Sequence, residues 1–174
     1  IDFAYPGDIV GLHDTGNFKI GDTFTEGEKL KFTGIPSFAP EQFRYIENAD
    51  PLKFKQLAKG IDQLMDEGVA QLFTSSLNGR KIIGTVGALQ FEVIEYRLAH
   101  EYNAACRWEP ISIYKACWIE SDNAEQLADF KRRKHTNMAT DKHGRDVFLA
   151  DTSYALALAQ ENFKDIRFYF TSEF

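Results

Sequence analysis

The sequence predicts a mixed protein of the α+β / α/β class. The end of a β-barrel over residues 1–38 is followed by a ferredoxin-like (split βαβ) α/β domain over residues 39–174. Three observations lead to this prediction. Six of the twelve glycines lie in the first 34 residues, between short alternating segments. Strand-like and helix-like patterns then alternate through the rest of the chain. The hydrophobic content of 44%, with 15 Phe, is sufficient for a packed core.

Three short segments of the glycine-rich part have a two-residue period, at residues 9–10, 18–20 and 29–32. Short strands between glycines are typical of a barrel or meander. Three strands leave unpaired edges and cannot close a barrel, so we expect this part to complete a β-domain that begins upstream. The first residue is Ile1 rather than Met, and we therefore expect the chain to be a piece of a longer protein.

A helix is predicted within residues 51–68, with Gly68 just past its end. Its apolar residues recur with helical spacing, at Phe54, Leu57, Ala58, Ile61, Leu64 and Met65. Asp50 is the expected N-cap, Pro51 occupies the first helical position, and Gly68 follows the last turn.

The neighbouring segments complete a recognisable order of elements. Strands are predicted at 43–46, 69–73, 81–86 and 104–108, with a second helix over about 88–101. This β-α-β-β-α-β order is that of a ferredoxin-like split βαβ unit. Further elements are predicted at 111–119 (strand), 123–134 (helix), 146–150 (strand), 152–162 (helix) and 166–171 (strand). The alternation favours one layered domain rather than two.

The second helix has apolar residues on two faces. Phe91, Ile94, Leu98 and Tyr102 line one face, and Leu89, Val93 and Tyr96 lie roughly opposite. Two stripes indicate a helix that is covered on both sides. The cover comes either from this chain, which is the favoured alternative, or from a neighbouring molecule.

Composition excludes several classes of protein. No run approaches the 18 or so apolar residues of a membrane span, so we expect no membrane partner. The net charge of −6 argues against a surface that coats nucleic acid generally. Two cysteines make no disulfide framework and no secretion leader is visible, so a reducing cytoplasm is the expected location.

No residue is predicted to be catalytic, cofactor-binding or metal-binding. The segment Gly16–Thr23 has the glycine spacing of a phosphate loop, but Asp22 stands where lysine is required. His135, Asp141 and His143 fit no zinc spacing, and a solvated turn is the favoured interpretation. Cys106 and Cys117 are expected to be small buried hydrophobes, and an enzyme that uses one of these thiols remains the alternative.

One cluster of cations has two interpretations. It consists of Lys131, Arg132, Arg133, Lys134, Lys142 and Arg145, and gives residues 131–145 a formal charge of +5. Cations at the end of a helix interact favourably with its dipole, and Asp122 and Glu125 supply negative charge at its start. Six cations exceed what a helix end needs, which indicates a focused anionic partner such as a phosphate backbone. Both interpretations remain open.

Several phrases carry a family resemblance. AYPGDIVGL at 4–12 and IGDT at 20–23 resemble the end of the second domain of translational GTPases, a β-barrel. FTGIPSFAPE at 32–41 is similar to the bacterial peptide chain release factor three family in particular. So are DPLK at 50–53, GVAQ at 68–71 and VGALQFEV at 86–93. The resemblance extends over essentially the whole chain, with few matching phrases after Ile119.

The resemblance implies a cytoplasmic GTPase of translation termination, which removes codon-reading release factors from the ribosome after peptide release. Its P-loop and N-K-x-D motif are missing from this sequence, so GTP, GDP and Mg are expected in an N-terminal nucleotide domain. This chain is then a non-catalytic barrel end and third domain. The expected partners are the small ribosomal subunit, contacted by the 131–145 cations, the codon-reading release factors and the chain's own GTPase domain. The alternative is a fragment of an elongation-type or ribosome-protection translational GTPase.

Overall fold

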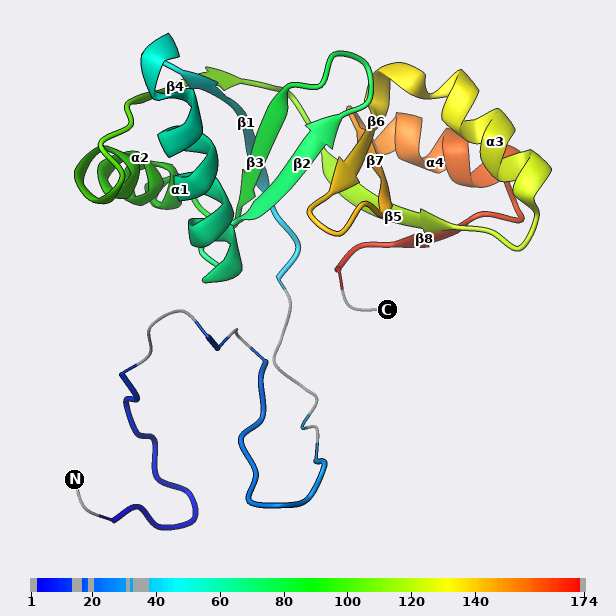
Figure 1. Ribbon diagram of the computed structural model, residues 1–174. Coiled ribbons are helices and arrows are strands. Elements are labelled where there is room, and N and C mark those ends of the chain that lie inside the picture. Colours follow the sequence, from blue (N-terminus) through cyan, green and yellow to red (C-terminus); the bar gives the residue numbers. More distant parts are fainter. Residues whose placement is uncertain (1–2, 14–16, 19–20, 31, 33–37, 173–174) are drawn as a thin grey trace. The chain divides into compact units, whose positions relative to one another are not determined.

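The computed structural model describes residues 3–13, 17–18, 21–30, 32 and 38–172. The chain divides into two compact units, Ile1–Ile35 and Pro36–Phe174. Figure 1 shows the helices and strands of the second unit.

The described residues of the first unit form turns and no strand. Two backbone hydrogen bonds between its described residues are local: the amide of Asp8 donates to the carbonyl of Tyr5 (3.0 Å), and that of Leu30 to the carbonyl of Glu28 (3.1 Å). The strands predicted at 9–10 and 29–30 are therefore wrong, because a strand requires a hydrogen-bonded neighbour. The predictions at residues 19–20 and 31 lie outside the described residues. The assignment of residues 1–38 to a barrel stays a prediction.

The first half of the second unit has the predicted ferredoxin-like order. Its elements are β1 (Gln42–Asn48), the 3-10 turn η1 (Pro51–Lys53), α1 (Phe54–Asp66), β2 (Gln71–Ser75), β3 (Lys81–Thr85), α2 (Leu89–Glu101) and β4 (Cys106–Pro110). The strands pair antiparallel in the order β4-β1-β3-β2. Asp50 caps the turn as predicted, since its carboxylate accepts a hydrogen bond from the Leu52 amide (3.0 Å).

The second half repeats this architecture. Its elements are β5 (Lys115–Glu120), α3 (Ala124–Arg133), the 3-10 turn η2 (His135–Asn137), β6 (Met138–Asp141), β7 (Asp146–Ala150), α4 (Ser153–Asn162) and β8 (Arg167–Tyr169). The strand order β6-β7-β5-β8 mirrors that of the first half. The sequence interpretation missed β6, and with it the second β-α-β-β-α-β unit. None of the described helices is long and apolar enough to cross a membrane.

The two halves share one eight-stranded sheet, which is joined where β2 pairs antiparallel with β6. Phe73 on β2 and Trp118 on β5 are fully buried, with ring centroids 5.8 Å apart. These strands lie three positions apart in the sheet, which would separate them by about 14 Å if the sheet were flat. The sheet is therefore bent, so that the helix-free surfaces of its two halves pack against each other. Figure 1 shows α1 and α2 on one side of the strands and α3 and α4 on the other.

The helix-covered faces bury two further cores. Leu57, Ile61, Leu64 and Met65 of α1 are buried as predicted. Phe54, which is 67% exposed, and Ala58 were wrongly placed on the buried stripe. Phe54 begins α1 immediately after η1, so its side chain precedes the turns that contact the sheet.

Helix α2 is covered on one face only. Phe91, Ile94 and Leu98 are fully buried, whereas Leu89 and Val93 are 68% and 42% exposed and Tyr96 is exposed as well. The favoured prediction, that this chain covers both stripes, is wrong within the described residues. Because α2 belongs to the outer layer of the domain, only its inner face meets the sheet and α1.

The approach of α2 to α1 depends on Gly60. A Cβ atom at this position would lie 2.6 Å from Leu98 Cδ2 and 2.9 Å from Tyr102 Cγ. Alanine is the better helix former by about 1 kcal/mol, so propensity alone predicts stabilisation. We expect the opposite for Gly60→Ala, a loss of about 1–3 kcal/mol in the free energy of unfolding, because the helices must move apart. Urea titration followed by tryptophan fluorescence measures this.

Gly87→Ala is the matched control, since a Cβ atom there meets nothing within 4 Å. A Gly60→Ala protein as stable as the wild type would show that α1 and α2 do not approach each other this closely at Gly60.

Candidate nucleic-acid interface

Helix α3 carries the first part of the cation cluster. Asn123 caps its start, where the side-chain oxygen accepts a hydrogen bond from the Gln126 amide (3.0 Å). One turn from its other end, Phe130 is fully buried and packs edge-on against Phe148 and Phe163, at centroid distances of 5.2 and 4.9 Å. This anchor fixes the end of the helix, where the sequence continues with Lys131, Arg132, Arg133 and Lys134.

The cations of α3 are only partly neutralised. Asp129 is shared by two of them: Arg132 forms an ion pair with it, and Arg133 Nε lies 2.8 Å from its Oδ2. Lys131 is paired with Asp146 of β7 (2.8 Å). The side chains of Arg132 and Arg133 remain 78% and 65% exposed. They are therefore positioned to meet a partner from solvent.

Lys134 adds a further positive charge beside them. It is half-buried at the end of α3, and its side chain makes no ion pair within the described residues. The carbonyl groups at a helix C-terminus favour cations, so this charge also interacts with the helix dipole.

The other two cations of the cluster are held within the fold. Lys142 forms an ion pair with Asp66 at the end of α1, which ties the β6–β7 turn to the first half of the domain. Arg145 Nε lies 2.8 Å from Asp141 Oδ2, and its Nη1 donates to the Ser172 carbonyl (2.8 Å). These two side chains are 31% and 33% exposed. We interpret both as structural contacts.

Asp141 organises the β6–β7 turn. Its side chain, only 7% exposed, accepts hydrogen bonds from Trp118 Nε1 (3.0 Å), the amides of His143 and Arg145 (both 2.9 Å) and Arg145 Nε (2.8 Å). Burial acts to raise the pKa of this carboxyl, but the hydrogen bonds from Arg145 and Trp118 outweigh it and the pKa is lowered. The interpretation of a solvated turn therefore fails for Asp141.

The structure thus separates the six predicted contact residues into two groups. Arg132, Arg133 and Lys134 form the α3 end, in which the two exposed arginines share the carboxylate of Asp129 and the half-buried Lys134 follows them. Lys131, Lys142 and Arg145 each have a carboxylate partner. The charge of +5 counted along the sequence overstates the free positive charge, because three of the four neutralising carboxylates lie outside residues 131–145.

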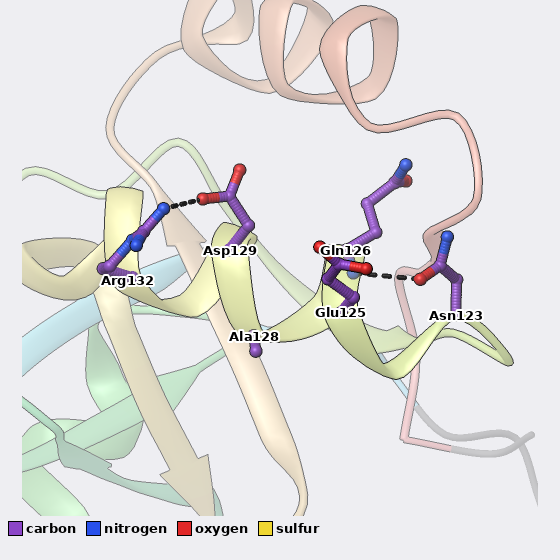
Figure 2. A pocket seen from close by; sticks show the side chains of 6 residues that line it. All are labelled: Asn123, Glu125, Gln126, Ala128, Asp129 and Arg132. Carbon is purple, nitrogen blue, oxygen red and sulfur yellow. Dashed lines mark hydrogen bonds and ion pairs between the residues drawn. The ribbon is translucent and has the colours of Figure 1, made fainter.

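A shallow surface cavity of about 540 Å³ borders the α3 end. It is lined by Asn123, Glu125, Gln126, Ala128, Asp129 and Arg132. Figure 2 shows these side chains along one helix, with Arg132 paired to Asp129. The described residues contain no group of three His, Cys, Asp or Glu side chains placed to hold a metal ion.

Neither cysteine has the environment of a nucleophile. Burial raises the pKa of the Cys106 thiol to about 12, and it raises the pKa of the Cys117 thiol to about 12 as well. Both thiols are therefore protonated at neutral pH, whereas the thiolate is the reactive form.

The family model described as "Class II release factor RF3, C-terminal domain" matches residues 32–160. The chain therefore belongs to this family, which confirms the resemblance to release factor three seen in the sequence. The chain is also similar to a crystal structure of a protein from Thermus thermophilus, with 16% sequence identity and a TM-score of 0.41. That similarity covers 59% of this chain and 17% of the other.

The role of Asp141 is testable through stability. We expect Asp141→Asn to lower the free energy of unfolding at pH 7 by about 2 kcal/mol, because buried donors lose a charged acceptor. The folded-state pKa is lowered, so the carboxylate contributes stability above its ordinary pKa of 3.8, and the contribution is lost as the pH falls through the folded-state value. The difference between variant and wild type should therefore shrink below pH 4.

Urea titrations across this pH range measure the effect. Asp62→Asn, on the exposed face of α1, is the control and should change stability little. An Asp141→Asn deficit that stays constant to the lowest pH at which the domain is folded would contradict this account.

Proposed function

We propose that this chain is the ribosome-docking part of a GTP-dependent termination factor, which removes codon-reading release factors from the ribosome after peptide release. The observation that carries the proposal is the match of residues 32–160 to the release-factor family. The phrases at 4–12 and 20–23 support an attached translational-GTPase barrel. The factor would act in the cytoplasm.

We infer that the nucleotide chemistry is supplied outside these residues. The sequence contains neither a G-x-x-x-x-G-K-[ST] loop nor an N-K-x-D motif. GTP, GDP and Mg would be held by an N-terminal GTPase domain. The domain formed by this chain would transmit the nucleotide-driven rearrangement to the ribosome through rigid contacts. The two four-stranded units joined through β2 and β6 are suited to that task, because a continuous sheet moves as one body.

The α3 end is the proposed contact with the small ribosomal subunit. Its two arginines share the carboxylate of Asp129 and are 78% and 65% exposed. Lys134 makes no ion pair within the described residues. Arginine and lysine bind a phosphate backbone by displacing counterions, an interaction that needs accessible charge but no shaped pocket. The α3 end thus meets the requirements for contact with ribosomal RNA on an otherwise acidic chain of net charge −6.

Charge reversal tests this proposal. We expect Arg132→Glu combined with Arg133→Glu to weaken association of the full factor with purified ribosomes by about tenfold near 0.1 M salt, since two phosphate contacts become repulsive. Sedimentation with fluorescently labelled factor measures binding. Release-factor dissociation from termination complexes should slow in parallel.

Lys55→Glu combined with Lys59→Glu is the matched control. Both lysines are exposed on α1, so the double reversal changes the net charge equally on another helix. Equal weakening by both double variants would show that the effect comes from net charge. Unchanged binding of the α3 variant would show that these arginines only stabilise the end of the helix.

A further inference from the structure

A row of exposed apolar side chains follows the outer face of α2 and takes no part in the contacts described above. Leu89, Val93 and Tyr96 are 68%, 42% and 63% exposed. His100 continues the row, with its ring stacked on that of Tyr96 at a centroid distance of 3.9 Å. The spacing of these four residues places them along one line of the helix, over about 16 Å. This α2 row has the length and chemistry of a helix-docking surface.

Negative charge borders the α2 row. The helix carries Glu92, Glu95 and Glu101 but one cation, Arg97. The Arg97 guanidinium binds Glu101 and, across the helix pair, Glu67 of α1. It is thereby neutralised and leaves the other two carboxylates of α2 uncompensated.

Glu95 accepts a hydrogen bond from Trp108 Nε1 (3.0 Å), a neutral donor that leaves its charge in place. Glu92 is exposed and makes no ion pair within the part of the chain that the structure describes. At 100° per residue, Glu92 flanks the row, whereas Glu95 lies on the side of the helix that faces Trp108. The negative charge beside the row is therefore that of Glu92 and, on the other flank, that of the Glu67–Arg97–Glu101 group, in which two carboxylates face one cation.

We propose that the α2 row is the docking surface for a basic amphipathic helix of a protein partner. Apolar side chains of such a helix would pack on Leu89, Val93 and Tyr96. Flanking lysines or arginines would meet Glu92 on one side and the carboxylates of Glu67 and Glu101 on the other. The same carboxylates repel RNA phosphates. In a chain of net charge −6 they also oppose pairing with a second copy, whose own carboxylates would face them. The proposal concerns a different helix from the α3 end and does not depend on ribosome binding.

The test uses the 174-residue chain and two fluorescein-labelled synthetic peptides of about 18 residues. Both peptides carry leucines with helical spacing; one has lysine at the flanking positions and the other has glutamate. Fluorescence anisotropy should show that the basic peptide binds at least about tenfold more tightly. Val93→Ser combined with Tyr96→Ser should weaken its binding about tenfold.

Two further variants separate docking from a folding effect. Tyr154→Ser removes an aromatic ring that is also exposed (73%) from α4, the counterpart of α2 in the second half, and should leave peptide binding unchanged. Glu92→Lys keeps the apolar row intact, and should weaken the basic peptide and strengthen the acidic one. Thermal unfolding confirms that each variant is folded.

Several results would overturn the proposal. These are equal binding of the two peptides, or basic-peptide binding that is unaffected by the Val93 and Tyr96 substitutions. A dimer that dissociates in the Tyr96 variant during sedimentation would assign the surface to a second copy instead. An RNA oligonucleotide that binds the wild type but not this variant would assign it to nucleic acid.

Discussion

The pairing of β2 with β6 is the constraint on which the rest of this domain depends. It joins two ferredoxin-like units edge to edge, and the bend of the resulting sheet brings Phe73 and Trp118 together in a shared core. Because the helix-free faces are buried against each other, what remains for a partner is the outer surface of the four helices and the rim of the sheet. Both surfaces considered above, the α3 end and the α2 row, lie on helices for this reason.

The two surfaces differ in charge, and the ion pairs on each helix determine the sign of the charge that remains. On α3, Asp129 is shared by two arginines, and Lys134 has no carboxylate partner among the described residues, so positive charge is in excess. On α2, Arg97 is shared by two glutamates and the remaining carboxylates are in excess. Surface ion pairs contribute at most about 1 kcal/mol each to stability. Their larger consequence here is to determine where unpaired charge is presented.

Sequence reasoning was most accurate where local signals are strong. The strand at 146–150 and the first ferredoxin-like unit follow from hydrophobic periodicity and from caps such as Asp50. Strand β6 was missed because it has four residues, of which only Met138 and Ala139 are buried, and lies within a polar, cationic stretch. The exposure of the α2 row was missed because a helical stripe shows which residues share a face, but not whether another element covers it.

The candidate site shows the same limit. The ion pairs of Asp129 with Arg132 and Arg133 have helical spacing and are accessible to sequence analysis. The pair of Lys142 with Asp66 joins residues 76 positions apart, and only the fold brings them together. Counting charges along the chain therefore located the basic region but included cations that other parts of the domain neutralise.

We propose that three cations at the end of α3, rather than all six of the cluster, contact a phosphate backbone. The most direct measurement is the salt dependence of binding between this chain and purified small ribosomal subunits. Three phosphate contacts predict a slope of about −2 to −3 for the logarithm of the association constant against the logarithm of salt concentration. A slope near zero, the absence of binding, or a slope near −5, as six contacts would give, would contradict the account.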